Sequence, residues 1–117
     1  MSIRDIADAI AELARSGQFD AIGETYWADD VVSIESGEGP MAHLEGREAV
    51  AAKSAWWAGA HEVHGSETHG PWINGDQFAL RFLMDVTVKE SGERMTMDEI
   101  ALYTIDDGEI VEERFYY

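Results

Sequence analysis

The second half of the chain alternates apolar and polar side chains, and this pattern restricts the fold more than any other feature. In FALRFLMDVTVK, residues 78–89, every second side chain is apolar, from Phe78 to Val88. Successive side chains of a β-strand point to opposite faces, so this segment predicts a strand with one buried face. Turn sequences rich in Asn, Asp and Gly, which tolerate the positive φ of tight turns, flank it at residues 74–76 and 91–92, and another follows at 107–108. The pattern predicts four antiparallel strands, near 62–73, 77–89, 94–105 and 109–117.

The N-terminal third predicts a helical hairpin. Apolar residues recur at helical spacing over residues 3–13, Ser2 can cap this helix together with Asp5, and Gly17 ends it. Residues 19–26 fit a second, shorter helix that follows after only two residues.

A strand and a third helix complete the predicted elements. The stretch VVSIE, residues 31–35, favours a strand in which Ser33 and Glu35 share a face with Val31. A loop over 36–46 leads to an alanine-rich helix over about 47–58. Adjacent helical residues point about 100° apart, so Trp56 and Trp57 cannot share a direction, and one of them should border a groove. Because helices come first and strands last, the order predicts an α+β fold with helices on one face of a curved sheet.

Composition narrows the class of protein. The 117 residues suit one domain over 1–117, and 45% of them are hydrophobic. No apolar run approaches the roughly 20 residues of a membrane span, and MSIRDIADAI lacks the features of a secretory signal. The chain has no cysteine, which excludes disulfides and thiolate chemistry and suits a reducing compartment. We therefore expect a cytoplasmic protein with no membrane partner.

The charge balance argues against nucleic acid as a partner. The formal net charge is −16, from 24 acidic and 8 basic residues, and Lys53 and Lys89 are the only lysines. A phosphate backbone requires a stripe of Lys and Arg, which this sequence lacks. A soluble, self-repelling surface is the simpler interpretation of the charge, and a cationic substrate is the second.

The densest group of possible metal ligands is HEVHGSETHG, residues 61–70, which is one residue short of the zinc motif H-E-x-x-H. Gly65 and the β-branched Val63 favour a strand here. Strict alternation would place His61 and His64 on opposite faces, with Glu62, Ser66 and Thr68 on the face of His64. Two histidines on opposite faces cannot chelate one metal, so we predict no metal site. The alternative is a metal bound by Glu62 and His64 with a third ligand such as Glu35.

The element order and three local motifs resemble the nuclear transport factor 2-like superfamily, in particular its SnoaL-like domains. The motifs are GQFDAIGETYWADDVVSIE, HLEGREAVAAKSAWW and IDDGEIVEERFYY, and the resemblance covers the whole chain. It implies a cone in which three N-terminal helices pack on a curved, antiparallel or mixed sheet. It indicates function poorly, because similar domains include ketosteroid isomerases, polyketide cyclases, dehydratases, epoxide hydrolases and non-catalytic binding proteins.

The resemblance to ketosteroid isomerases carries over only in part. Their general-base carboxylate falls on Glu35, but their two oxyanion-hole donors fall on Ile10 and Ala101, which donate no side-chain hydrogen bond. Because loss of one such donor costs about 10²–10³ in rate, the sequence argues against a steroid isomerase of that design. The resemblance also turns the face of Glu35 into the cone, where burial would suit a general base.

We therefore select Glu35 as a candidate base and His64 as its acid/base partner. The position of Ala101 in the resemblance also predicts that Met97, Glu99 and Tyr103 face the pocket, with Arg81 as a candidate partner for Glu99. The remaining ligand-binding candidates, for which a core role is the simpler interpretation, are Trp56 and Trp57.

These observations predict a cofactor-free protein with an apolar pocket for a small organic molecule. Acid/base catalysis of an isomerase, cyclase, dehydratase or hydrolase type would use Glu35 with His64 or Tyr103. A non-catalytic ligand-binding or dimerisation module is the alternative, and a protein-protein adaptor is a weaker one. An outward apolar patch of Ile100, Leu102 and residues 115–117 predicts a homodimer formed through the sheet, as the resemblance also implies.

Overall fold

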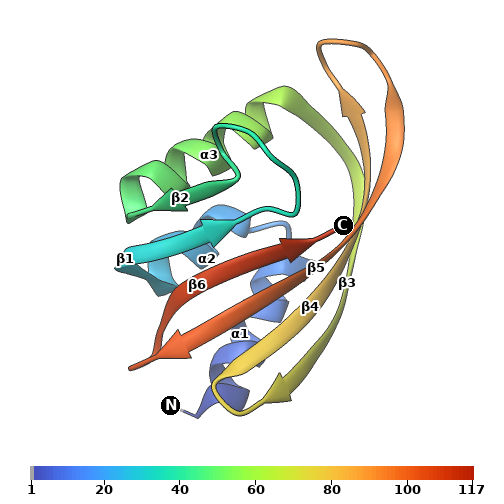
Figure 1. The fold of residues 1–117 in the computed structure, drawn as a ribbon. Coiled ribbons are helices and arrows are strands. Elements are labelled where there is room, and N and C mark those ends of the chain that lie inside the picture. The colour runs from blue at the N-terminus through green and yellow to red at the C-terminus, as the bar shows by residue number, and fades with distance from the viewer. Residues whose placement is uncertain (1) are drawn as a thin grey trace.

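The computed structural model describes residues 2–117, and within this range three helices pack against one six-stranded sheet (Figure 1). The helices are α1 (Ile3–Arg15), α2 (Phe19–Tyr26) and α3 (Arg47–Ala60). The strands are β1 (Trp27–Ile34), β2 (His43–Glu45), β3 (His61–Asn74), β4 (Gln77–Val88), β5 (Arg94–Asp106) and β6 (Glu109–Tyr116). This arrangement confirms the predicted α+β class and the predicted order of its main elements.

The sheet is mixed, with the strand order β2-β1-β6-β5-β4-β3. The strands β3 to β6 form an antiparallel meander, while β1 pairs with β6 in parallel. The turn between β5 and β6 places Asp107 at φ 50° and Gly108 at φ 77°, which are the residue types that tolerate the left-handed region. The three predicted hairpins are therefore confirmed, and the parallel pair adds a strand from the first half of the chain.

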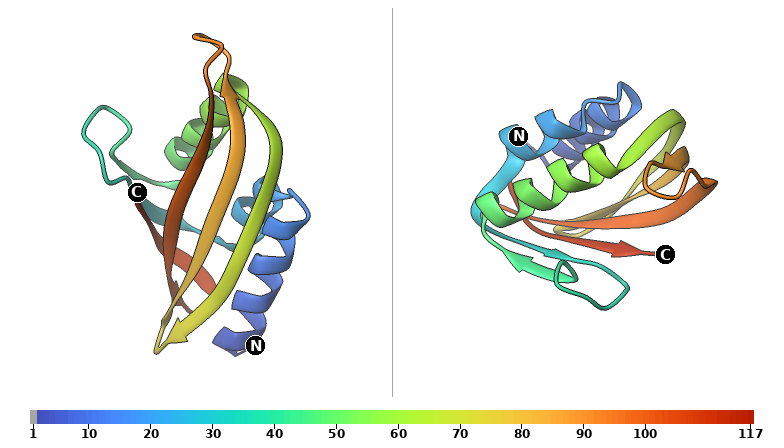
Figure 2. Two further views of the ribbon diagram at one scale, coloured as in Figure 1. Left: turned by 90° about the vertical axis from the view of Figure 1, so that its right-hand side faces the viewer. Right: turned by 90° about the horizontal axis from the view of Figure 1, so that it is seen from above.

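All three helices lie on the concave face of the strongly curved sheet (Figure 2). The first helix begins with the predicted capping box, in which Ser2 Oγ accepts from the amide of Asp5 at 3.2 Å. Its apolar stripe contacts β3 and β4, while α3 packs against β1. Large side chains that are fully buried in this core include Ile10, Val31, Phe78 and Leu80. Burial of this stripe holds α1 against β3 and β4, whereas α3 lies over β1.

Two elements differ from the sequence-based prediction. The expected loop contains the short strand β2, which pairs with β1, and its three residues are too few to give a periodic signal. The third helix continues through Gly59 to Ala60. His61 Nδ1 donates to the carbonyl oxygen of Trp57 at 2.8 Å and so satisfies a group at the end of this helix. No helix of residues 2–117 has the length and hydrophobicity needed to span a bilayer.

Bulges change which side chains face the helices, and two of them affect the residues considered below. In β3 the register moves from Val63 opposite Val86 to Gly65 opposite Asp85, so His64 is the extra residue. In β6 the register shifts between Ile110 and Glu112. Each bulge reverses the inward and outward alternation beyond it. The face predicted to hold Glu62, His64, Ser66 and Thr68 together is therefore divided at His64.

The bulge in β6 also divides the predicted C-terminal patch. Phe115 is opposite the buried Ala101, and both Phe115 and Tyr117 line a cavity on the inner side. Tyr116 lies opposite Ile100 and is 48% exposed. The expectation that residues 115–117 form one outward surface is wrong, and the homodimer stays a prediction.

Candidate functional site

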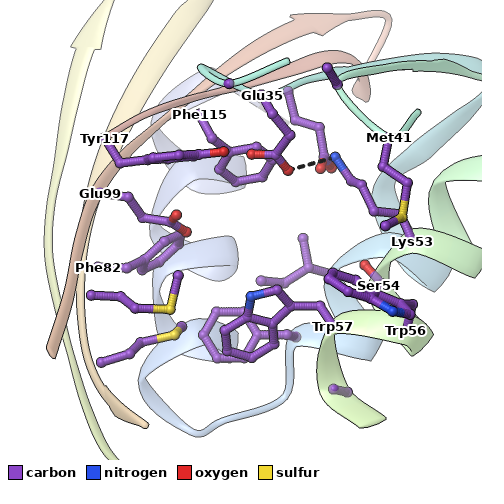
Figure 3. Close-up of a pocket in the computed structure, with 18 of the residues that line it drawn as sticks. Glu35, Met41, Lys53, Ser54, Trp56, Trp57, Phe82, Glu99, Phe115 and Tyr117 are labelled. Atoms are coloured by element: carbon purple, nitrogen blue, oxygen red, sulfur yellow. Dashed lines mark hydrogen bonds and ion pairs between the residues drawn. The ribbon is translucent and has the colours of Figure 1, made fainter. Parts of the chain in front are cut away.

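A cavity of about 590 Å³ opens between α2, α3 and the concave face of the sheet. The loop over residues 36–42 forms part of its mouth, and strands β3 to β6 form the opposite wall. The wall is mainly apolar and aromatic, with Trp57, Phe82 and Phe115 among the side chains that face the space (Figure 3). A volume of this size accommodates a small organic molecule.

Lys53 is the centre of the polar side of the cavity. Its Nζ donates to Glu35 Oε1 at 2.9 Å and to Ser33 Oγ, and it lies 5.3 Å from the centre of the Phe115 ring. The side chain of Lys53 is only 10% exposed, and that of Glu35 is 24% exposed. An ammonium group has three N–H donors. Two of those of Lys53 are used in hydrogen bonds, and the aromatic ring also stabilises the positive charge.

Glu113 continues this network into the protein interior. Its carboxylate accepts from Trp27 Nε1 at 2.7 Å and from Ser33 Oγ at 3.0 Å. Burial raises the pKa of Glu113, and the hydrogen bond from Ser33 and the charge of Lys53 oppose this effect. Lys53, Ser33 and Glu113 thus form a continuous chain of hydrogen bonds that begins at Glu35.

Glu99 projects into the same cavity from β5, but its environment differs (Figure 3). No side chain or backbone amide among residues 2–117 donates a hydrogen bond to its carboxyl group. Burial raises the pKa of Glu99 to about 7, the charge of Glu35 adds to this increase, and Lys53 partly opposes it. Among the carboxyl groups that line the cavity, Glu35 is therefore in an ion pair, whereas Glu99 takes up a proton near neutral pH.

Two tyrosines border these carboxyl groups. Tyr103 is 4% exposed and stacks on Phe78 with ring centres 5.1 Å apart, and burial raises its pKa well above the ordinary value. Tyr117 lies at the mouth, where its ring approaches Glu35 (Figure 3). Partial burial and then the charge of Glu35 raise the pKa of Tyr117. Both phenols therefore stay protonated in the neutral range.

The structure brings six of the seven predicted site residues to this cavity. Those six are Glu35, Trp56, Trp57, Met97, Glu99 and Tyr103. Their role in binding or catalysis stays a prediction, because their position alone does not test it.

His64 is the residue that the prediction misplaced. It is exposed on the outer face of the sheet, and its Nε2 is 2.7 Å from Thr87 Oγ1 on the neighbouring strand. The bulge at His64 turns this side chain away from the cavity, and Val63 lines the cavity instead. His64 cannot act as a partner of Glu35 from this position.

The other histidine of the motif, His61, stacks on Trp57 with ring centres 4.4 Å apart. It therefore lies on the helix side of the sheet, opposite to His64, as the alternation predicted. Among residues 2–117, no three His, Asp or Glu side chains are grouped as metal ligands.

The sequence-based choice of partner for Glu99 was also wrong. Arg81 lies on the outer face, where its Nε and Nη2 donate to the two carboxylate oxygens of Asp98 at 2.9 and 2.7 Å. Glu99 is the next residue along β5, so its side chain points to the opposite face. The largest effects of charge on its pKa come from Glu35 and then from Lys53.

Lys53 and Glu113 were not selected from the sequence. A signal for Lys53 exists, because Val50, Lys53 and Trp57 lie on one face of α3 and Val50 is fully buried. Glu113 had no such signal. Simple alternation from the buried Ile110 would place Glu112 inward, and only the bulge in β6 turns Glu113 to the cavity.

Comparisons with known proteins identify the family. The model of the SnoaL-like domain matches residues 1–117. The chain belongs to the SnoaL-like domain family. A solved structure from Mesorhizobium loti is 55% identical over 100% of both chains, with a TM-score of 0.98. That SnoaL-like protein has been suggested to be a polyketide cyclase and also a carbohydrate phosphatase.

More distant structures share the fold of this SnoaL-like chain. A protein from Catenulispora acidiphila with a ketosteroid isomerase-like fold, solved in complex with trimethylamine, is 22% identical with a TM-score of 0.75. The match covers 96% of this chain and 84% of that one. A protein from Xanthomonas campestris, described as having a cystatin-like fold, is 19% identical with a TM-score of 0.78. That match covers 99% of this chain and 90% of the other. No match was found among curated proteins.

These findings confirm the predicted resemblance to SnoaL-like domains and the cone fold. The two positions that hold oxyanion-hole donors in ketosteroid isomerases, Ile10 and Ala101, are both fully buried in the core. Glu99 lies two residues before Ala101 on the same face of β5, and it is one of the acidic side chains that line the cavity.

Proposed function

We propose that this SnoaL-like protein binds a small, mainly apolar organic molecule and catalyses a cofactor-free proton transfer on it. Glu35 would act as the general base and Glu99 as the general acid. The observation that supports this proposal is the pair of carboxyl groups in one cavity, held in different environments. Glu35 is paired with Lys53, whereas burial raises the pKa of Glu99 to about 7. Such a pair is the usual arrangement of an acid and a base in one active site.

The chemistry that follows is a transfer of two protons. Glu35 would remove a proton from a carbon beside a carbonyl group, and Glu99 would donate its proton to the oxygen as the negative charge develops there. Reversal of these transfers at another atom completes an isomerisation. Attack of the same carbanion on a second carbonyl group, whose oxygen takes the proton back from Glu35, completes a cyclisation. Loss of a hydroxyl group, which takes this proton from Glu35 and leaves as water, completes a dehydration. All three reactions need a neutral Glu99 at the start.

Of the two activities suggested for the Mesorhizobium loti relative, the cyclase type suits this cavity better. Stabilisation of a transferring phosphoryl group requires cationic partners. Among residues 2–117, Lys53 is the only Lys or Arg that lines the cavity, and it is already bound to Glu35 and Ser33. Proton transfer requires no further cation.

Hydrogen exchange at carbon tests the proposal even though the natural substrate is not identified. A panel of uncharged ketones, enones and keto esters is incubated with the protein in deuterated buffer, and deuterium at carbon is measured by mass spectrometry. We expect exchange in at least one compound and a decrease of about 10²–10⁴-fold in Glu35→Gln and in Glu99→Gln. Exchange should also decrease as the pH rises through about 7, because Glu99 loses its proton there.

Glu67→Gln is the matched control, because Glu67 is exposed and does not line the cavity. It removes the same charge and should leave exchange unchanged. If exchange persists in both cavity variants, Glu35 and Glu99 are not the catalytic pair. Binding of panel compounds without any exchange would favour the alternative function, a non-catalytic ligand-binding module.

A further inference from the structure

The charges that line the cavity are unbalanced. Within residues 2–117, five of the lining side chains are acidic and one is basic. The acidic ones are Asp20, Glu35, Glu38, Glu99 and Glu113, and the basic one is Lys53. Asp20 and Glu38 are exposed at the mouth, whereas Glu113 is buried at the inner end. An entering molecule therefore meets carboxyl groups at both ends of its path.

The single ammonium group does not offset this imbalance for a ligand. Lys53 donates to Glu35 and to Ser33, and the ring of Phe115 covers it at 5.3 Å. Its side chain is 10% exposed, so little of it faces the open space. A negatively charged ligand would have to displace the Glu35 carboxylate to gain a cationic partner, which would leave that carboxylate buried and unpaired.

The remaining polar groups suit an uncharged ligand. At neutral pH a large fraction of Glu99 is protonated and can donate a hydrogen bond to a carbonyl or hydroxyl oxygen. Burial already makes a second negative charge costly here, as the raised pKa values of Glu99 and Glu113 show. A ligand carboxylate or phosphate would meet the same loss of hydration with no free cation to compensate it.

We infer that the cavity excludes anions, so that its ligand is an ester, ketone, alcohol or other molecule without an acidic group. This inference rests on the proposed small-molecule function and restricts its substrates to uncharged forms. An ester would therefore bind where its parent acid does not. The preference for the ester over the acid should arise from the carboxyl groups inside the cavity. The acidic surface of the protein should contribute little to this preference once salt is added.

Competition against a fluorescent reporter tests this inference. N-phenylnaphthylamine is uncharged and becomes fluorescent in apolar surroundings, and its binding near Trp56 and Trp57 should quench their emission. Methyl naphthoate and naphthoate, which differ in one charged group, then compete with it. We expect the ester to displace the reporter at a concentration at least about tenfold lower than the acid, which corresponds to ~1.4 kcal/mol. High salt should preserve this ratio, because it screens exposed charges more than buried ones.

The pH dependence identifies the responsible group. The ratio should grow as the pH rises through about 7, where Glu99 becomes charged, while naphthoate stays ionised throughout this range. Glu99→Gln should remove this pH dependence, and Glu67→Gln on the outer face should preserve it.

The possible outcomes separate this inference from the proposed function. If naphthoate competes as well as its ester in high salt, the exclusion of anions is overturned while binding of small molecules stands. If the ratio is the same at all pH values, or unchanged in Glu99→Gln, the cavity carboxyl group is not its cause and the inference fails. If neither the reporter nor the ester binds, the proposed binding function fails and the inference fails with it.

Discussion

Acidic side chains on the two faces of the sheet have pKa values that are shifted in opposite directions. On the outer face, Arg81 pairs with Asp98 and Arg94 pairs with Asp85, each through two hydrogen bonds of 2.7 to 3.0 Å. The hydrogen bond from each arginine is the main cause of the lowered pKa of its aspartate. These pairs are exposed, and each joins diagonal positions of the strand pair, since Arg81 lies opposite Ile100 and Asp85 lies opposite Thr96.

On the inner face, desolvation is the main influence on the carboxyl groups. The pKa values of Glu99 and Glu113 are raised, and burial is the first cause in both cases. Lys53, which comes from α3 and not from the sheet, is the cation that opposes the effect. The charges on the inner face are therefore sparsely compensated.

This difference indicates what each face contributes. Exposed pairs add little to folding and can be exchanged without consequence, whereas buried groups with incomplete pairing lower stability. Such groups are commonly found where a protein needs a perturbed acid or base. The contrast between the faces can be tested by removing one charge at a time, starting with Lys53, the cation of the inner face.

Lys53→Met should have the largest effect. It leaves Glu35 without its ionic partner and Ser33 without a donor, and loss of one partner of a buried pair costs about 3–5 kcal/mol. We expect a decrease of this size in the free energy of unfolding in urea at about pH 8. The decrease should be smaller at about pH 5, where Glu99, whose pKa is raised to about 7, has taken up a proton.

Two further variants support the interpretation of that result. Lys89→Met removes the other lysine, which is exposed beside a turn, and should change stability little. Lys53→Met combined with Glu35→Leu removes both charges and should recover most of the loss, because an apolar pair leaves no buried charge. Equal losses in the single and double variants would mean that Lys53 stabilises the fold by packing and not by charge.

Glu99→Gln should have a smaller effect of the opposite sign. Its pKa rises from 4.5 to about 7 on folding, so the folded protein binds more protons and stability decreases as the pH rises through this window. That shift corresponds to roughly 3 kcal/mol, and contact with water in the cavity should reduce it to about 2 kcal/mol. The variant should therefore be more stable than the parent at about pH 8 and equal to it below about pH 4.5.

Urea titrations at both pH values measure this difference directly. Glu67→Gln, on the outer face of β3, provides the comparison for a charge that folding leaves in water. A Glu99→Gln protein that is less stable than the parent at both pH values would show that the carboxyl group is favourably bound, which would contradict the raised pKa.

Much of the fold could be predicted because its signals are local. The period of apolar residues identified α1 and β4, and the Asp107-Gly108 turn identified the last hairpin. The shared face of Val31, Ser33 and Glu35 was also correct, because the register is regular from Val32 to Ile34. The strand β2 was missed, since three residues carry no period.

The candidate site was harder to predict because it depends on interruptions of those local patterns. The bulges in β3 and β6 move His64 out of the cavity and Glu113 into it, and nothing in either segment marks the extra residue. The environment of Glu99 depends on Lys53 and Glu35, which are distant in sequence. Alternation along one strand can place a carboxyl group on a face, but it cannot identify the partner that will meet it there.

The outer pair of Arg81 and Asp98 should show the smallest effect of the three. Their side chains are 44% and 51% exposed, so water and salt screen their attraction even though the geometry is favourable. We expect Arg81→Gln, Asp98→Asn and the double variant to change the urea midpoint far less than Glu99→Gln does, and high salt should remove any coupling between them. A double-mutant cycle at low and high salt measures this coupling. A coupling that survives high salt and equals the effect of Glu99→Gln would show that both faces depend on their charges equally, and the contrast between them would be lost.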